Sequence, residues 1–385
     1  MSDIRQSWYE AGARERIAAL VDSGSFAEFV GPERRETSPH LGIFDLPAQF
    51  DDGIVVGSAT LDGTPILVAA QEGRFMGGAF GEVHGAKLTG LLRAAKALGR
   101  DVVIAFDTGG VRLQEANAGE IAIAEIMRAV VEARIAGVRV VGLIGGRAGC
   151  YGGGGLIAGC CSTLIVSEQG RISVTGPEVI ETNMGVEEFD SRDRALVWRT
   201  MGGKHRTLIG GADVFVDDDA AAFRDAARAA LAQSARPLSV RSAYPHSFAL
   251  SEVEGLGSID GASTSLSTTG GGSIDGASTS PSTNGGGSIG GASTSLSTNG
   301  GGSIDGASTA PSTNGSGERP GLDLDTLAAE QARLERRIAR FGDAADATDI
   351  WQALGIDDPK AVPDMPATAF ATLAAQYRES ADDAR

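Results

Sequence analysis

The chain has 385 residues, of which 42% are hydrophobic and 55 are glycine, so we expect one large globular domain rich in tight turns and close backbone approaches. Its formal charge of -17 argues against binding to nucleic acids or anionic membranes. It has only three cysteines, none in a CxxC pair, and no apolar run of about 18 residues, so we expect no disulfide framework, zinc ribbon, signal peptide or membrane anchor and a cytoplasmic location.

The first predicted element is a helix over residues 8–20, where apolar side chains recur at helical spacing. Residues 54–70 hold two apolar runs around Asp62 and Gly63, which predicts a β-hairpin. Strands and helices then alternate. We expect strands at residues 102–106, 138–144 and 163–167, and helices at about 82–98, at 119–136 and from 153 onwards. This alternation is typical of βαβ units with parallel strands.

Two glycine-rich turns follow the first two of these strands. The first turn is residues 107–112 and the second turn is residues 145–155. Parallel neighbouring strands place such turns at one edge of the sheet, where α/β proteins tend to bind ligands. N–H groups from both turns that converge on one point form an oxyanion hole, which suits a thioester enolate. The candidate catalytic donors are Gly109, Gly110, Val111, Gly152, Gly153 and Gly154.

Both turns also have ordinary structural interpretations. The first is compatible with a plain strand-to-helix turn, and the glycines of the second with close packing of a helix on the sheet. Residues 153–158 match a G-x-G-x-x-A pattern but begin about eight residues after the strand, which argues against dinucleotide binding. His84 and His205 are candidate proton donors to carbon, although a lone histidine is more often structural. We place His205 in a turn.

Residues 258–317 are four near-copies of a 15-residue unit rich in glycine, serine and threonine. Each copy has too few large apolar residues to form a hydrophobic stripe, so we predict a disordered linker instead of a solenoid. Two amphipathic helices are expected after it, at residues 322–341 and 366–378. The predicted organisation is a main domain over residues 1–250, a linker over 251–320 and a helical C-terminal segment over 321–385, packed on the main domain or a partner.

Several segments together resemble the acyl-CoA carboxyltransferase family, a branch of the crotonase superfamily. They are residues 13–17, 24–26, 75–78, 107–115, 145–155 and 176–178. Within that family, five segments are similar to the β subunits of biotin-independent malonate decarboxylases: residues 71–78, 81–87, 115–119, 176–181 and 198–205. The similarity covers about residues 4–250 and resumes in the tail. The four-cysteine zinc ribbon of bacterial acetyl-CoA carboxylase β subunits is absent, and the repeats have no counterpart in the family pattern.

The resemblance implies an α/β, crotonase-like (ClpP/crotonase) carboxyltransferase domain and an enzyme of the lyase class. Such a β subunit acts with a homologous γ subunit and converts malonyl-S-acyl-carrier protein to acetyl-S-acyl-carrier protein and CO2. The malonyl group is carried by a phosphoribosyl-dephospho-CoA group on the acyl-carrier subunit, so no cofactor or metal is expected in this chain. An acyl-carrier transferase α subunit is a further expected partner. The expected substrate-binding residues are Met76, Gly77, Gly78, Arg112, Gln114, Gly176 and Pro177.

Three alternatives stay open at this point. A biotin-dependent acyl-CoA carboxyltransferase β subunit would share the fold and the two turns but exchange the carboxyl group with biotin. A stand-alone enoyl-CoA hydratase or isomerase would need paired acids in the cleft, for which Glu115, Glu120 and Glu178 are available. A non-enzymatic scaffold would rest on the repeats alone.

Overall fold

The computed structural model describes residues 6–45, 49–233, 324–344 and 346–378. The predicted linker therefore lies outside the described residues, and the division of the chain into three parts stays a prediction. The described residues all belong to one compact unit. None of their helices is both long and apolar enough to cross a membrane.

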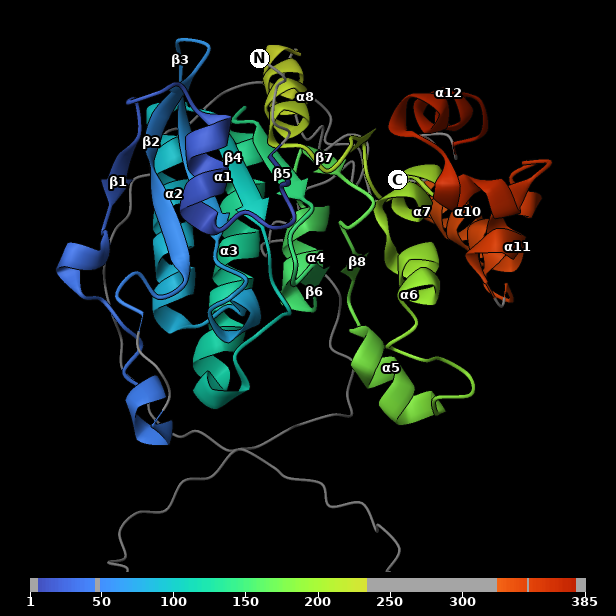
Figure 1. Ribbon diagram of the computed structural model, residues 1–385, viewed down its shortest axis with the longest axis horizontal. Helices are drawn as coiled ribbons and strands as arrows, with labels where there is room; N and C mark the ends of the chain where they lie inside the picture. Colours follow the sequence, from blue (N-terminus) through green and yellow to red (C-terminus); the bar gives the residue numbers. More distant parts are fainter. Residues whose placement is uncertain (1–5, 46–48, 234–323, 345, 379–385) are drawn as a thin grey trace, which may run out of the picture. The chain divides into compact units, whose positions relative to one another are not determined.

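A seven-stranded mixed sheet organises the described chain (Figure 1). The β1–β2 and β2–β3 pairs are antiparallel, and the remaining neighbours are parallel. In spatial order the strands are β1 (Ala27–Phe29), β2 (Ile54–Leu61), β3 (Thr64–Gln71), β4 (Val102–Phe106), β5 (Val140–Ile144), β7 (Thr163–Val166) and β9 (Val214–Phe215). A separate parallel pair is formed by β6 (Cys150–Tyr151) and β8 (Ile172–Ser173).

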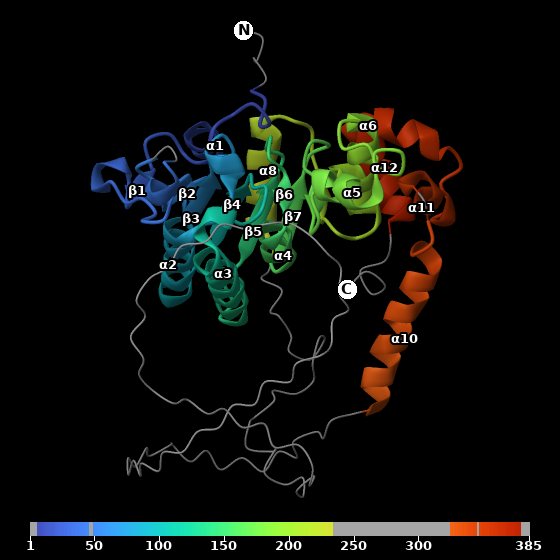
Figure 2. The same ribbon diagram turned by 90° about the horizontal axis from the view of Figure 1, so that it is seen from below.

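Helices cover both faces of the sheet (Figure 2). One face packs on α2 (Glu82–Leu98), α3 (Asn117–Ile135) and α4 (Gly153–Gly159), and the other packs on α1 (Ala13–Leu20) and α8 (Ala220–Ala232). Strands β4 and β5 are buried at every position because both of their faces are covered. Between β8 and β9 the chain forms α5 (Pro177–Met184), α6 (Arg194–Met201) and α7 (Gly203–Leu208).

The hairpin around Asp62 and Gly63 and the parallel arrangement of the predicted strands are confirmed. The first helix is shorter than predicted and begins at Ala13, where the Gly12 N–H donates to the Glu15 carboxylate. The turn predicted around His205 is wrong, since this residue lies in α7. Alternation of apolar residues gave no signal for β1, β6, β8 and β9, because each is only two or three residues long.

The C-terminal segment packs on the main domain, one of the two predicted outcomes. It contains α10 (Leu324–Phe341), α11 (Ala347–Ala353), a 3-10 turn (Pro359–Asp364) and α12 (Ala367–Tyr377). Trp351 and Phe370 form a buried cluster with Leu208 of α7. Polar contacts reinforce this packing, since Arg378 donates to the Ala212 and Asp213 carbonyls at 2.8 and 3.0 Å.

His205 also belongs to this junction. The residue is 6% exposed, and its Nδ1 accepts a hydrogen bond from the Trp351 indole at 3.2 Å, which requires an unprotonated Nδ1. Burial, with the charge of Arg206, lowers the pKa of His205 to about 3. The ring is thus a contact between the main domain and the tail, and it does not belong to the two turns.

Because His205 is neutral in the folded chain, we expect acid to reduce the free energy of unfolding. The unfolded chain takes up the His205 proton near pH 6.5, whereas the folded chain holds it off until about pH 3. The stabilisation is therefore complete above pH 6.5 and is lost as the pH falls towards 3, by up to about 1.4 kcal/mol per pH unit. His205→Gln keeps an acceptor for the indole and removes the titration. Urea unfolding between pH 6 and 4 should show a shallower pH slope for this variant, and equal slopes would contradict the assignment.

Candidate functional site

The two glycine-rich turns lie side by side at the carboxyl ends of β4 and β5, as predicted. Two backbone hydrogen bonds join them. Thr108 N donates to the Gly149 carbonyl at 2.8 Å, and Tyr151 N donates to the Thr108 carbonyl at 2.9 Å. The end of β4 is therefore fixed directly to the segment that leads into α4.

Three of the six predicted donors already donate to atoms of this chain. Such N–H groups hold the turns in shape and are not free to meet a substrate oxygen. The acceptors are the Gly77 carbonyl for Gly109 (2.8 Å), Thr108 Oγ1 for Gly110 (3.1 Å) and the Val174 carbonyl for Gly152 (3.1 Å).

The other three predicted donors are Val111, Gly153 and Gly154. Within the described part of the chain, the Val111 N–H has no hydrogen-bond acceptor. Gly153 and Gly154 are the first two residues of α4, where a helix has N–H groups with no carbonyl one turn earlier. The positive end of the helix dipole adds to the attraction for negative charge. The structure thus narrows the candidate oxyanion donors to one residue of the first turn and two at the start of α4.

Glycine is required at two points where the turns meet. Gly110 has φ +129° and Gly152 has φ +56°, which side chains rarely adopt. A Cβ on Gly152 would also lie 3.3 Å from the Gly110 Cα. The glycines that follow have another cause, because a Cβ on Gly153 would lie 2.5 Å from the Ile123 side chain and one on Gly155 would lie 2.7 Å from the Ser173 carbonyl. Close packing of α4, the structural interpretation, therefore accounts for those two.

The predicted substrate-binding segment Met76–Gly78 lies beside the first turn. All three of its residues have positive φ, which is strained for Met76. The Gly77 carbonyl accepts the Gly109 N–H. A Cβ on Gly78 would overlap the Asp107 carbonyl, so only glycine permits this approach. Gly77 and Gly109 are exposed, so a ligand can reach the surface where the Met76–Gly78 segment meets the first turn.

Arg112, predicted to bind substrate, is fully buried and already paired. Its Nη1 donates to Asp52 Oδ2 at 2.8 Å and to Glu115 Oε1 at 3.0 Å, while Nη2 donates to the Asp52 carbonyl at 2.8 Å. The guanidinium also lies 5.2 Å from the Phe75 ring centre. These contacts make Arg112 an anchor of the first turn. Gln114 lies in the following 3-10 turn and is partly exposed.

His84, the predicted proton donor, is also fully buried. Its Nε2 lies 3.0 Å from the Gln71 side-chain nitrogen and its Nδ1 lies 3.1 Å from the Asp52 carbonyl, which assigns the proton to Nδ1. Burial, with the nearby Arg112 charge, lowers the pKa of His84 well below its usual value. The ring is therefore neutral and occupied on both sides. The geometry gives it a structural role under the Met76–Gly78 segment in place of proton transfer.

Gly176 and Pro177 lie at the start of α5, just beyond β8. Gly152 N donates to the carbonyl of Val174 in the intervening segment, so α5 begins close to the second turn. Exposed apolar side chains flank this region, namely Leu156 at 44%, Val174 at 60% and Val179 at 53% exposure. A substrate or partner that covers the turns would therefore meet an apolar surface.

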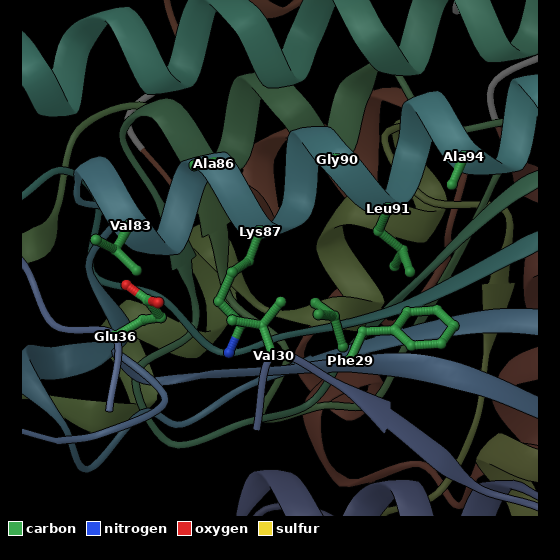
Figure 3. Close-up of a pocket in the computed structure, with 10 residues that line it drawn as sticks. Phe29, Val30, Glu36, Val83, Ala86, Lys87, Gly90, Leu91 and Ala94 are labelled. Atoms are coloured by element: carbon green, nitrogen blue, oxygen red, sulfur yellow. The ribbon is translucent and has the colours of Figure 1, made fainter. Parts of the chain in front are cut away.

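A pocket of about 410 Å³ lies elsewhere, between α2 and the β1 edge of the sheet (Figure 3). Figure 3 shows Gly90 and Leu91 of α2 on one side and Phe29 and Val30 on the other. No residue of the two turns lines it. Lys87 on its wall donates to the carbonyls of residues 51 and 54, which stabilises the segment that holds His84 and Arg112. Among the described residues, no group of three or more potential ligands is arranged to hold a metal ion.

The sequence profile of the carboxyl transferase domain matches residues 10–242, which include every residue of the two turns. The chain belongs to the carboxyl transferase domain family. Its fold is the crotonase-like carboxyltransferase fold that the sequence predicted, with α/β layers and a helical C-terminal region. The resemblance inferred from the motifs is thereby confirmed.

Two similar proteins have names that mention malonyl groups or malonate. The chain is 44% identical over 241 residues to the malonyl-S-ACP:biotin-protein carboxyltransferase of Malonomonas rubra, covering 59% of this chain and 76% of the relative. In a Pseudomonas malonate decarboxylase hetero-tetramer in complex with malonate, one subunit is 40% identical. That match has a TM-score of 0.59 and covers 68% of this chain and 94% of the subunit.

A more distant relative is the propionyl-CoA carboxylase β chain of Saccharopolyspora erythraea, 34% identical over 174 residues. The match covers 45% of this chain and 31% of that protein. The chain thus spans most of the length of the malonyl-related proteins but under a third of this acyl-CoA carboxylase chain.

Proposed function

We propose that this chain is the β-type subunit of a malonate decarboxylase, which releases CO2 from malonyl held as a thioester on an acyl-carrier protein. The observation that carries the proposal is the joined pair of turns, with the Val111 N–H on one and the first N–H groups of α4 on the other. The similarity to the Pseudomonas malonate decarboxylase subunit over 94% of its length supports the choice of substrate.

In the proposed reaction the thioester carbonyl oxygen accepts hydrogen bonds from Val111 and the start of α4. The bond between the α carbon and the carboxylate breaks, CO2 leaves, and its bonding electron pair forms the enolate. The negative charge then lies on the oxygen, where the N–H donors are already in place. The proton that the α carbon takes up comes from a solvent water or from a group of the partner subunit, since His84 and His205 are both buried and occupied. The product is an acetyl thioester.

The partners belong to the same proposal. The malonyl group arrives on a phosphoribosyl-dephospho-CoA arm of the acyl-carrier subunit, and a γ subunit completes the site over the apolar surface around Val174. Transfer of the acyl carrier by an α subunit precedes decarboxylation. The related structure is a hetero-tetramer, which supports the presence of partner subunits.

A second candidate function is carboxyl transfer from the malonyl thioester to a biotin protein, because the 44% identical relative bears that name. The oxyanion site would serve both reactions, since the same enolate forms. An enoyl-CoA hydratase or isomerase is less well supported, because the chain belongs to the carboxyl transferase domain family and Glu115, one of the three candidate acids, is buried against Arg112.

The deciding experiment is an assay of the purified complex with radiolabelled malonyl-S-acyl-carrier protein, with and without a biotin carrier protein. The expected result is release of labelled CO2 without the biotin carrier. Label that appears on the biotin carrier, with no release in its absence, would replace the proposal by the second candidate. Absence of both reactions in an intact complex would reject both.

A further inference from the structure

A buried carboxylate joins the two turns to the N-terminal helix. Asp107 follows β4, and its side chain is 4% exposed. Its Oδ1 accepts the Ala148 N–H of the second turn at 2.6 Å, and its Oδ2 accepts a hydrogen bond from Arg16 Nη1 of α1 at 2.8 Å. Both carboxylate oxygens are therefore used within the chain, and Asp107 is not available to a ligand.

Two glycines leave room for this carboxylate. A Cβ on Gly73 would lie 2.5 Å from Asp107 Oδ2, and a Cβ on Gly146 would overlap the carboxylate carbon. Neither glycine has positive φ, so backbone conformation does not explain them. The space around Asp107 explains both. The packing of three separate segments is thus adapted to one carboxylate.

Arg16, the partner of Asp107, is itself held in place. It is 1% exposed, and its Nε donates to the Trp8 carbonyl at 3.1 Å. The Trp8 ring stacks on Phe223 of α8 with ring centres 4.5 Å apart. The guanidinium is therefore fixed by the layer of helices that covers the opposite face of the sheet from α4.

The position of α4 depends on these contacts. Three hydrogen bonds hold the second turn to the end of β4: one to the Asp107 carboxylate and two to the Thr108 backbone. The chain reaches Gly152 one residue after Tyr151, and α4 begins at Gly153. A shift of the segment that begins at Ala148 would therefore move the N–H groups of Gly153 and Gly154 away from the Val111 N–H.

We propose that Asp107, fixed by Arg16, is a positioning residue for the oxyanion site. It sets the second turn so that the N–H groups at the start of α4 and the Val111 N–H meet at one oxygen. It acts through the backbone and does not contact the substrate. The expected change in kcat rests on the proposed function, whereas the contacts of Asp107 with Ala148 and Arg16 do not depend on which reaction is catalysed.

The test is Asp107→Asn. Asparagine has the same shape but a single acceptor oxygen, so in either orientation it loses one of the two contacts and sets two donors against each other. We expect kcat for decarboxylation to fall about 10- to 100-fold, since a displaced catalytic group has effects of that order. KM should stay within about twofold, because Asp107 does not bind substrate.

The outcome that contradicts the proposal is direct. If Asp107→Asn folds and keeps full kcat, the two contacts of Asp107 do not position the oxyanion site, and the positioning role is wrong.

A matched control lies at the other end of the same two strands. Asp101 accepts the backbone N–H of Arg139 at 2.8 Å and its Nε at 3.0 Å, so Asp101→Asn breaks a similar but more exposed arrangement far from the turns. This control should lose stability without loss of kcat. An equal fall in kcat in both variants would indicate a general effect of instability and would overturn the proposal.

Hydrogen exchange separates this inference from the proposed function. The hydrogen-bonded backbone amides of residues 148–152 should exchange faster in Asp107→Asn than in the wild type or in Asp101→Asn, whatever reaction the complex catalyses. Unchanged exchange would disprove the positioning contact even in an active enzyme. If Asp107→Asn exchanges faster but the wild-type complex releases no CO2, only the proposed function is rejected.

Discussion

Replacing the Val111 amide by an ester is expected to lower kcat for malonyl-thioester decarboxylation by about 100- to 1,000-fold. Loss of one oxyanion donor typically has this effect, equivalent to about 2.7 to 4 kcal/mol. The ester, introduced by incorporating the α-hydroxy analogue of valine, removes the N–H and keeps the side chain. Because this N–H has no acceptor within the described residues, its removal breaks no internal hydrogen bond, although the Gly110 carbonyl becomes a weaker acceptor for the Phe80 N–H. Rates at saturating substrate provide the measurement.

The same exchange at Ala124, an exposed position inside α3, is the control. It removes one helical hydrogen bond and leaves the turns unchanged, so kcat should stay near the wild-type value. If the Val111 ester is as active as this control, Val111 is not an oxyanion donor. Substitution of Gly153 tests the site less cleanly, since its Cβ would meet Ile123 and displace α4.

Replacing Arg112 with Met is expected to reduce the free energy of unfolding by about 3 to 5 kcal/mol. Methionine fills similar space but leaves the Asp52 and Glu115 carboxylates buried without their cation, which is the costly way to break a buried ion pair. Urea unfolding of the wild type and variant gives this difference. If the total stability lies at the lower end of the about 5 to 15 kcal/mol typical of domains, this loss leaves part of the variant population unfolded.

Arg128→Met on the exposed side of α3 is the matched control. Arg128 is 64% exposed and lies 3.6 Å from Glu125, so its removal should change stability by less than about 1 kcal/mol. A different result for Arg112→Met, with wild-type stability and a raised KM, would restore the substrate-binding role that the sequence motif suggested.

Val111 and Arg112 are neighbours in the sequence but have different expected functions. Val111 and Arg112 are adjacent in one motif, yet the backbone of the first has an N–H with no acceptor among the described residues, whereas the side chain of the second is enclosed by carboxylates. A motif match assigns both to the site without distinguishing them. Hydrogen-bond partners and burial make that distinction, since a group whose bonds are satisfied internally has little left to offer a ligand.

The amino-acid sequence determined the main layers of this protein. The apolar strands, the hairpin at Asp62 and Gly63, the alternation with helices and the adjacent glycine-rich turns were all predictable, because their apolar periodicity and turn residues are local signals. The family also followed from the sequence, since several motifs occur together in one order. These features depend on residues that are close along the chain.

Only the tertiary structure decided which groups of the site are available. It showed that Gly109, Gly110 and Gly152 donate internally, that His84 is a buried neutral ring, and that Asp107 is held by Arg16. Each of these outcomes depends on a contact between segments far apart in sequence, for which the chain carries no local pattern. Residue type shows that a group can donate or accept a proton or hydrogen bond, but only folding decides whether a partner has already taken that capacity.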